Sequence, residues 1–140
     1  MMRFLLDTCV LSDTIGKQPN EGLRQWLLQA DPATTFLSVV SLGEIQRGIE
    51  RKPASKRRTE LERWFSQQIL PQSVGRIFSI DLDTMQTWSH MMANLERKGR
   101  PMPLMDSLIA ATALTHDLMI VTRNVGDFEP TGVRVLNPWT

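Results

Sequence analysis

Short apolar runs rich in β-branched and aromatic residues alternate along this chain with longer segments of helical periodicity, and this alternation restricts the fold most strongly. Strands separated by helices are usually parallel, because each connecting helix carries the chain back to the same edge. We therefore predict an α/β fold, a three-layer sandwich with a mostly parallel central sheet and helices on both faces. Strands are expected at residues 3–7, 35–40, 76–80, 118–122 and 133–136, and helices around 23–30, 54–69, 85–95 and 104–116.

The length and composition predict a single domain. The chain has 140 residues, of which 41% are hydrophobic, enough for one substantial core over residues 1–140. Cys9 is the only cysteine, which excludes an intramolecular disulfide and a cysteine metal cage. No run approaches the roughly 20 apolar residues of a membrane helix, and the N-terminus does not resemble a signal peptide. We expect a cytoplasmic protein.

Three acids follow predicted strands or open a predicted helix. Asp7 ends the first strand and Glu44 follows the second, so both are expected at the carboxyl edge of the sheet, where α/β proteins bind ligands. Asp106 is the only charge in an apolar helical stretch. Each acid has a simpler interpretation. Asp7 could cap a turn, Ser41 and Glu44 have the spacing of a capping box, and the helix dipole favours Asp106 in a first turn.

A fourth acidic region follows the strand predicted at 118–122. Asn124 and Asp127 both lie just beyond its carboxyl end, where a loop or turn role is the alternative for each. Clustered carboxylates repel one another unless a hard divalent cation such as Mg²⁺ or Mn²⁺ relieves the conflict. Such an ion can activate water and hold a scissile phosphate. The pattern therefore predicts metal-dependent hydrolysis of a phosphodiester.

The ordered set of motifs resembles the PIN-domain ribonucleases of the VapC toxin class, in particular their FitB-like branch. The matching pieces span the chain: Leu5–Thr8 with Val10–Ser12, Leu37–Ser38 with Leu42–Glu44 and Gly48, Asp106–Ala113, Val121–Asn124 with Asp127–Phe128, and Val135–Trp139. This resemblance implies a Mg²⁺- or Mn²⁺-dependent endoribonuclease, the toxin of a type II toxin–antitoxin pair. It also implies a homodimer, a cognate VapB-type antitoxin and an RNA substrate, with tRNA favoured over ribosomal RNA.

Residue by residue, Asp7, Glu44 and Asp106 match the three core acids of the family and are the expected metal ligands. The fourth family acid falls on Asn124, so either Asp127 takes its place or three acids suffice. Cys9 stands where the family often has Asn. Thr8, Ser12 and Thr122 are expected to orient the acids by hydrogen bonds.

Basic residues concentrate in the middle of the chain. Seven lie between positions 47 and 63, and a smaller group precedes Asp106. One interpretation is a solvated helix face with internal ion pairs. The other is contact with RNA phosphates, for which Arg47, Arg51, Lys52 and Arg100 are the candidates. The alternative to an enzyme is a catalytically weakened PIN-like module that binds RNA or protein. Asn124 favours this interpretation, because it stands where the family has its fourth acid.

Overall fold

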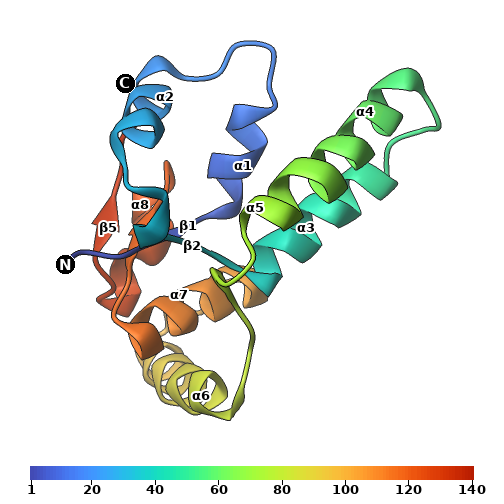
Figure 1. Cartoon of the computed structure of the whole chain (residues 1–140). Coiled ribbons are helices and arrows are strands. Elements are labelled where there is room, and N and C mark those ends of the chain that lie inside the picture. Colours follow the sequence, from blue (N-terminus) through green and yellow to red (C-terminus); the bar gives the residue numbers. More distant parts are fainter.

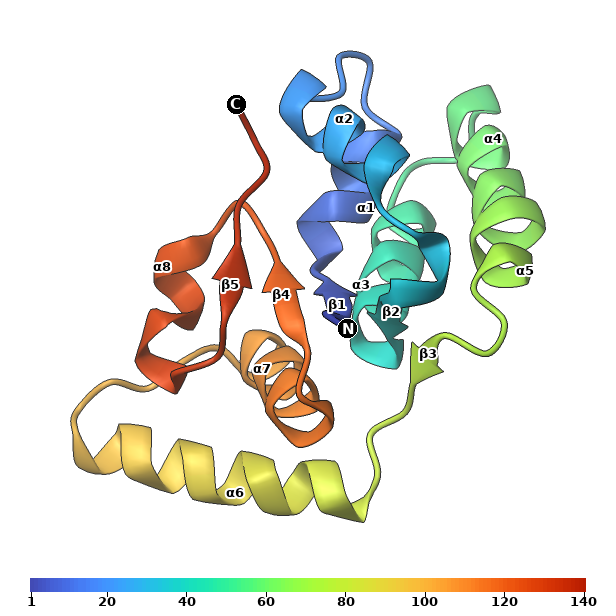
Figure 2. The same ribbon diagram turned by 60° about the vertical axis from the view of Figure 1, so that its left-hand side comes forward.

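The computed structural model describes residues 1–140 and has one five-stranded sheet in which every neighbouring pair is parallel. The strand order is β3-β2-β1-β4-β5, which places β1 at the centre (Figures 1 and 2). Leu5 of β1 is level with Phe36 of β2 and Ile120 of β4, so the three central strands end close together. The predicted parallel sheet is confirmed. The strands are β1 Phe4–Leu6, β2 Thr35–Ser38, β3 Ile77–Phe78, β4 Met119–Val121 and β5 Val135–Leu136.

Helices cover both faces of the sheet, as predicted, because successive strand residues point to opposite sides. Leu5 and Ile120 enter one buried cluster, and their neighbours Leu6 and Val121 enter the other. The first cluster is completed by α6 and α7, the second by α1 to α4 (Figure 2). The helices are α1 Thr8–Thr14, α2 Glu21–Gln29, α3 Val39–Glu50, α4 Lys56–Trp64, α5 Leu70–Gln72, α6 Leu82–Arg97, α7 Leu104–His116 and α8 Val125–Phe128.

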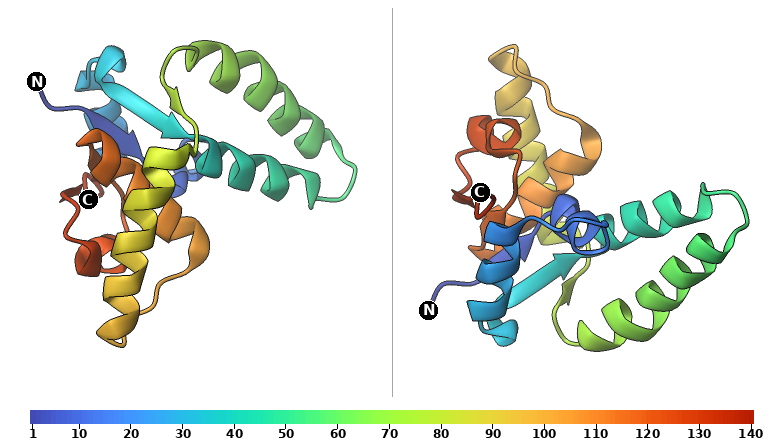
Figure 3. Two further views of the ribbon diagram at one scale, coloured as in Figure 1. Left: turned by 90° about the horizontal axis from the view of Figure 1, so that it is seen from below. Right: turned by 90° about the horizontal axis from the view of Figure 1, so that it is seen from above.

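The helices α3 and α4 pack against each other and extend away from the sheet as a helical arm (Figure 3). Ser55 begins α4, because its hydroxyl accepts a hydrogen bond from the backbone N–H of Arg58. A π-helical stretch, Phe65–Ile69, continues α4 into α5. The helix predicted over residues 54–69 is therefore present and runs slightly further.

Two local predictions differ from the structure. The strand expected at 35–40 ends at Ser38, whose side chain caps α3 by accepting a hydrogen bond of 3.0 Å from the N–H of Val40. Ser41 and Glu44 consequently lie inside α3, and the capping-box interpretation of this pair is wrong. The helix α1, which starts directly after Asp7, was not expected from the periodicity.

The C-terminal residues fold back onto α2 (Figure 1). The backbone N–H of Thr140 donates to Asn20 Oδ1 at 3.1 Å, and the N–H of Gly22 donates to Thr140 Oγ1 at 3.2 Å. A Cβ atom on Gly22 would collide with the carbonyl oxygen of Pro138 and the side chain of Thr140. The close approach of the two backbones therefore requires glycine here.

Among the helices of the structure, none has the length and apolar character needed to cross a membrane.

Candidate active site

Asp7 is buried immediately beyond β1, where hydrogen bonds fix both of its carboxylate oxygens. Oδ1 accepts from the backbone N–H of Thr8 at 2.8 Å, which also caps α1. Oδ2 accepts from the hydroxyl of Thr122, at the end of β4, at 2.8 Å. The turn-capping interpretation thus describes only half of this side chain, because the bond to Thr122 joins two strands distant in sequence.

Thr8 connects Asp7 to the second acid. Its hydroxyl donates to Glu44 Oε1 at 2.7 Å and lies 3.1 Å from the hydroxyl oxygen of the buried Ser41. These contacts join the first turn of α1 to α3, which packs beside it. The second carboxylate oxygen of Glu44 has no partner in the chain and remains available to a ligand.

Asp106 occupies the first turn of α7, and its pKa is raised from 3.8 to about 6. The largest cause is desolvation by burial, and the next is the negative charge of Asp7, followed by the charges of Asp127 and Glu44. The carboxylate makes no hydrogen bond within the chain. Three acids from other parts of the sequence therefore act on Asp106 at the carboxyl edge of the sheet.

The start of α7 is held in place by its neighbour α6. The indole N–H of Trp88 donates to Ser107 Oγ at 2.8 Å, and the Ser107 hydroxyl donates to the carbonyl of Leu104 at 2.6 Å. Ser107 is fully buried. Because Asp106 precedes it directly, this link fixes the backbone that carries the acid.

The structure places the two candidates for the fourth position differently. Asn124 uses its backbone N–H, which donates to Thr122 Oγ1 at 3.0 Å, while its side chain is exposed and makes no hydrogen bond. Asp127 lies in the first turn of α8 and is one of the charges that raise the pKa of Asp106. The electrostatic evidence therefore favours Asp127 as the fourth acid.

Cys9 packs directly against this network. Its Sγ lies 3.7 Å from Asp7 Oδ2 and 3.6 Å from Thr122 Oγ1. Burial is the main cause that raises the pKa of the Cys9 thiol, and the charge of Asp7 acts in the same direction. The group is therefore a protonated thiol at neutral pH, a weak donor to Asp7.

The donor set fits a hydrated hard cation. No three His, Cys, Asp or Glu side chains converge into a ready-made set of metal ligands. Mg²⁺ does not need one, because it keeps several waters and binds through one or two carboxylates together with substrate phosphates. Asp106 and Glu44 both offer carboxylate oxygens without partners, and the repulsion that raises the pKa of Asp106 is the kind that a cation relieves.

The remaining predicted residues lie around this centre. Ser12 is exposed on α1 and makes no hydrogen bond to an acid. Arg47, Lys52 and Arg51 are exposed on or just after α3, and Arg100 is exposed in the loop before α7; none forms an ion pair. The ion pairs of the basic segment belong to α4 instead, where Arg57 lies 3.7 Å from Glu60 and Arg58 lies 2.8 Å from Glu62. The ion-pair interpretation thus applies to α4, whereas the cations on and after α3 are left without ion-pair partners.

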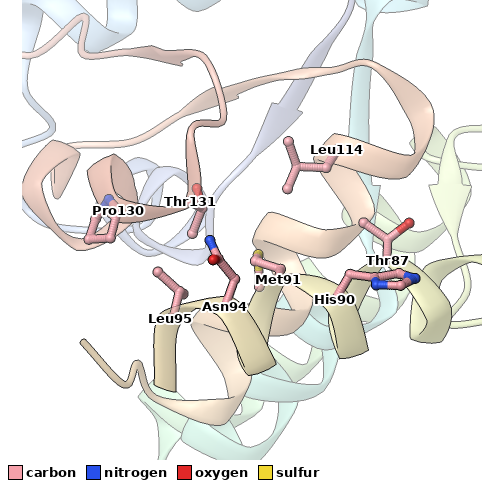
Figure 4. A pocket seen from close by; sticks show the side chains of 8 residues that line it. All are labelled: Thr87, His90, Met91, Asn94, Leu95, Leu114, Pro130 and Thr131. Carbon is pink, nitrogen blue, oxygen red and sulfur yellow. The ribbon is translucent and has the colours of Figure 1, made fainter. Parts of the chain in front are cut away.

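Two cavities bear on the choice of site. The larger, about 480 Å³, lies between α6, α7 and a 3-10 turn at Glu129–Thr131, with His90 and Asn94 at its side (Figure 4). None of the candidate acids lines it. A smaller pocket of about 260 Å³ is lined by Thr8 and Glu44 and therefore opens directly from the acidic centre. No sequence pattern indicated this pocket, since its walls come from three separate helices.

A parallel α/β domain that gathers carboxylates at the carboxyl edge of its central strands defines a class of protein suited to cation-assisted phosphate chemistry. The sequence profile described as "PIN domain" matches residues 4–129. The chain therefore belongs to the PIN-domain family, and within it to the VapC/FitB group that the following relatives represent. The PIN domain is a nuclease domain, and its nucleases generally depend on a divalent metal ion.

Three relatives align along nearly the whole chain. VapC ribonuclease Y4jK of Sinorhizobium fredii is 33% identical over 135 residues, covering 96% of each chain. Toxin FitB of Neisseria gonorrhoeae is 33% identical, covering 96% of this chain and 97% of the relative. The tRNA(fMet)-specific endonuclease VapC of Shigella flexneri is 29% identical and is covered completely, as is this chain.

A solved structure of FitAB bound to the IR36 DNA fragment contains a chain with the same fold. The TM-score is 0.93 at 31% sequence identity, and the match covers 98% of this chain and 96% of the other. The structural similarity thus extends over both layers of helices and the helical arm, not only over the sheet.

Proposed function

We propose that this protein is an endoribonuclease, dependent on Mg²⁺ or Mn²⁺, that acts as the toxin of a type II toxin–antitoxin pair. The observation that carries the proposal is the electrostatic interaction of Asp106 with Asp7, Glu44 and Asp127 at one edge of the sheet. Membership of a nuclease family, with relatives named as ribonucleases, supports the same activity.

A divalent ion bound at this edge would supply an activated water and neutralise charge on the scissile phosphate. Asp106 and Glu44 would hold the ion through their unpartnered oxygens, together with Asp7, whose carboxylate is already fixed by hydrogen bonds. The Thr122 hydroxyl and the N–H of Thr8 both donate to Asp7 and hold its carboxylate in one orientation. The Thr8 hydroxyl orients Glu44 by a hydrogen bond of the same kind. Asp127 contributes negative charge from the rim.

For the substrate we propose RNA, with tRNA as the first choice. The name of the Shigella flexneri relative, a tRNA(fMet)-specific endonuclease, supports this choice. Glu44 and Arg47 lie on α3, and the cations Arg51 and Lys52 follow directly after it. RNA phosphates bound by these unpaired cations would therefore lie beside the acids. Action on cellular RNA assigns the protein to the cytoplasm, a compartment that also suits a free thiol at Cys9.

For the partners we propose a second copy of the chain and a VapB-type antitoxin. The similarity to FitAB supports this assembly. A cluster of carboxylates without a metal ion attracts a cation, so we expect an arginine of the antitoxin to reach Asp106 and its neighbours. A complex in which the acidic centre faces no cationic side chain would contradict this detail.

The first experiment tests the enzyme. Purified protein is incubated with total tRNA and Mn²⁺ or with EDTA, and Asp7→Asn is compared with Asp83→Asn, an exposed acid of α6 outside the site. We expect cleavage by the wild type and by Asp83→Asn only with Mn²⁺, and none by Asp7→Asn. Equal cleavage by both variants would exclude a metallonuclease built on Asp7 and would favour a module that binds without chemistry.

The second experiment tests the toxin. Expression without antitoxin should arrest bacterial growth, and Asp106→Ala should relieve the arrest because it removes a metal-binding carboxylate. A folded Asp106→Ala protein that remains equally toxic would show that the toxicity arises elsewhere. Mapping the cleaved ends in total RNA then identifies the substrate.

A further inference from the structure

The pocket of about 260 Å³ beside the acids has two chemically different ends. Thr8 and Glu44, both part of the hydrogen-bonded acidic network, line its inner end, and Lys52 lies where α3 finishes. Its walls include the apolar side chains of Ile15 and Leu61, from α1 and α4. The pocket thus leads from the carboxylates along an apolar passage to an unpaired cation.

We propose that this pocket is a nucleoside subsite, which receives the base of an RNA nucleotide next to the scissile phosphate. The inference rests on the proposed ribonuclease activity, since it places the substrate relative to the catalytic acids. It makes the arm formed by α3 and α4 a determinant of which nucleotide precedes or follows the cut.

The chemistry of the lining fits a nucleotide. The faces of a base are apolar and pack against aliphatic side chains, whereas its edge needs polar partners such as the hydroxyls of Thr8 and Ser12. Lys52 carries an ammonium group without an ion-pair partner and can meet a phosphate oxygen of the same strand. Glu44 belongs both to the pocket and to the acidic network. A nucleotide whose base occupies the pocket therefore has its phosphate next to the acids.

The backbone keeps the pocket open and keeps its walls together. Gly48 lines it, and a Cβ added there would meet no atom within 4 Å, so the absence of a side chain leaves space that a ligand can use. Arg57 of α4 donates to the carbonyl oxygen of Ile15 at 2.7 Å, which fastens the arm to the end of α1 across the pocket. The larger cavity beside α6 differs, since no glycine, Lys, Arg or candidate acid lines it.

Gly48→Met fills the pocket, and Gly43→Met is its matched control. Gly43 is also an open position of α3, where an added Cβ meets nothing within 4 Å, but it lies roughly 140° around the helix from Gly48. Binding of AMP, GMP, CMP and UMP is measured by NMR titration in EDTA, with ribose 5-phosphate and inorganic phosphate as probes that lack a base.

We expect the wild type and Gly43→Met to bind at least one nucleotide, and Gly48→Met to bind it about tenfold more weakly, because the added side chain takes the space of the base. Ser12→Met, which enters the pocket from α1, should weaken binding in the same way and serves if Gly48→Met does not fold. Binding of ribose 5-phosphate as tight as that of every nucleotide would overturn the proposal, because the base would then contribute nothing.

Cleavage supplies the second readout. On an RNA oligonucleotide that the wild type cuts, removing the base on one side of the cut should lower kcat/KM about tenfold for the wild type. The same removal should have no further effect on Gly48→Met. These results would support the subsite. Equal sensitivity of both proteins to the abasic nucleotide would overturn it.

Two other outcomes separate the possible failures. One outcome is a wild type that binds nucleotides in the pocket lined by Gly48 but cuts no RNA. This result contradicts the proposed function and still supports the pocket as a nucleotide-binding site. A Gly48→Met protein that binds nucleotides and cuts RNA normally but escapes inhibition by the antitoxin assigns the pocket to a protein segment and overturns the subsite.

Discussion

At the scale of single residues, the Thr122 hydroxyl has two roles that no apolar side chain can replace. It donates to Asp7 Oδ2 and accepts from the N–H of Asn124. We predict that Thr122→Val lowers kcat by about 10- to 100-fold, the usual effect of losing a group that orients a metal ligand. Thr122→Ser should restore most of the rate. The measurement is steady-state RNA cleavage in Mn²⁺, with thermal melting as a check on folding, and a Ser variant as slow as Val would contradict a hydrogen-bonding role.

Asp106 makes a second residue-scale prediction, which concerns stability. Its folded pKa of about 6 lies above its ordinary value of 3.8, so between these pH values the folded state binds more protons than the unfolded state. The stability contributed by this group is therefore present at low pH and is lost as pH rises through about 6. Without metal, Asp106→Asn should stabilise the protein at pH 7.5 by on the order of 1 kcal/mol, a value reduced because water screens this partly exposed carboxyl.

The test is urea denaturation of both proteins in EDTA at pH 7.5 and pH 4.5. The advantage of Asp106→Asn should shrink at pH 4.5, where the wild-type carboxyl is mostly protonated. Saturating Mg²⁺ should reverse the order at pH 7.5, since the ion binds the folded wild type through this carboxylate. An advantage that is the same at both pH values would show that packing, not charge, distinguishes the two proteins.

At the scale of secondary-structure elements, the sequence patterns predicted all five strands and most of the longer helices but not the short helix α1. The helices α6 and α7 were predicted because several apolar residues recur at helical spacing. Helix α1 has only seven residues and mixes Thr, Cys and Ser with two buried apolar residues, so its sequence carries little periodic signal. It is stabilised by the long-range contacts of Asp7 and Thr8, which one-dimensional patterns do not contain.

The start of α3 shows how two local signals can compete. Ser38 and Ser41 both precede helical residues, and the Ser41–Glu44 spacing resembles a capping box. The structure uses Ser38, because β2 pairs with β3 only as far as this residue. Glu44 is thereby freed from a capping role and turns toward Thr8, which is why this correction strengthens the candidate site.

The contact between α2 and the C-terminus makes an element-scale prediction. Gly22→Ala places a methyl group against the Pro138 carbonyl and Thr140, so the final residues must move and their hydrogen bonds to Asn20 and Gly22 are strained. We expect a loss of about 1–3 kcal/mol in the free energy of unfolding, typical of overpacking. Gly43→Ala, in the open interior of α3, should instead stabilise by about 0.5–1 kcal/mol. Chemical denaturation measures both, and a neutral Gly22→Ala would mean that the tail is not packed against α2.

At the scale of the whole molecule, the acids could be predicted individually but their geometry could not. Parallel strands and their carboxyl edge were enough to group Asp7, Glu44 and Asp106, and the family resemblance added the fourth position. The choice between Asn124 and Asp127 depended on the short helix α8, which places Asp127 where its charge acts on Asp106. The pocket lined by Gly48 and Ile15 depends on how three helices pack, and no sequence pattern encodes that.

The net charge of +1 also conceals an uneven arrangement of charge. Arg47, Arg51 and Lys52 lie unpaired on the arm near Glu44, while Arg58 is held by Glu62 at 2.8 Å. If the unpaired cations contact RNA phosphates, each contact releases counterions from the strand. In a plot of the logarithm of the binding constant against the logarithm of the salt concentration, each contact then adds about −0.7 to the slope. We predict that Arg51→Ala makes this slope less steep by about 0.7 for single-stranded RNA, whereas Arg58→Ala leaves it unchanged.

Fluorescence anisotropy with a labelled single-stranded RNA, measured in EDTA over a range of KCl concentrations, gives the slopes without cleavage. Arg51→Ala and Arg58→Ala remove the same charge, so the net charge of the protein changes equally and only the position differs. Equal slopes for the two variants would mean that RNA responds to the overall charge of the molecule and not to the cations of α3. A smaller slope for Arg58→Ala alone would move the RNA path to the opposite helix of the arm.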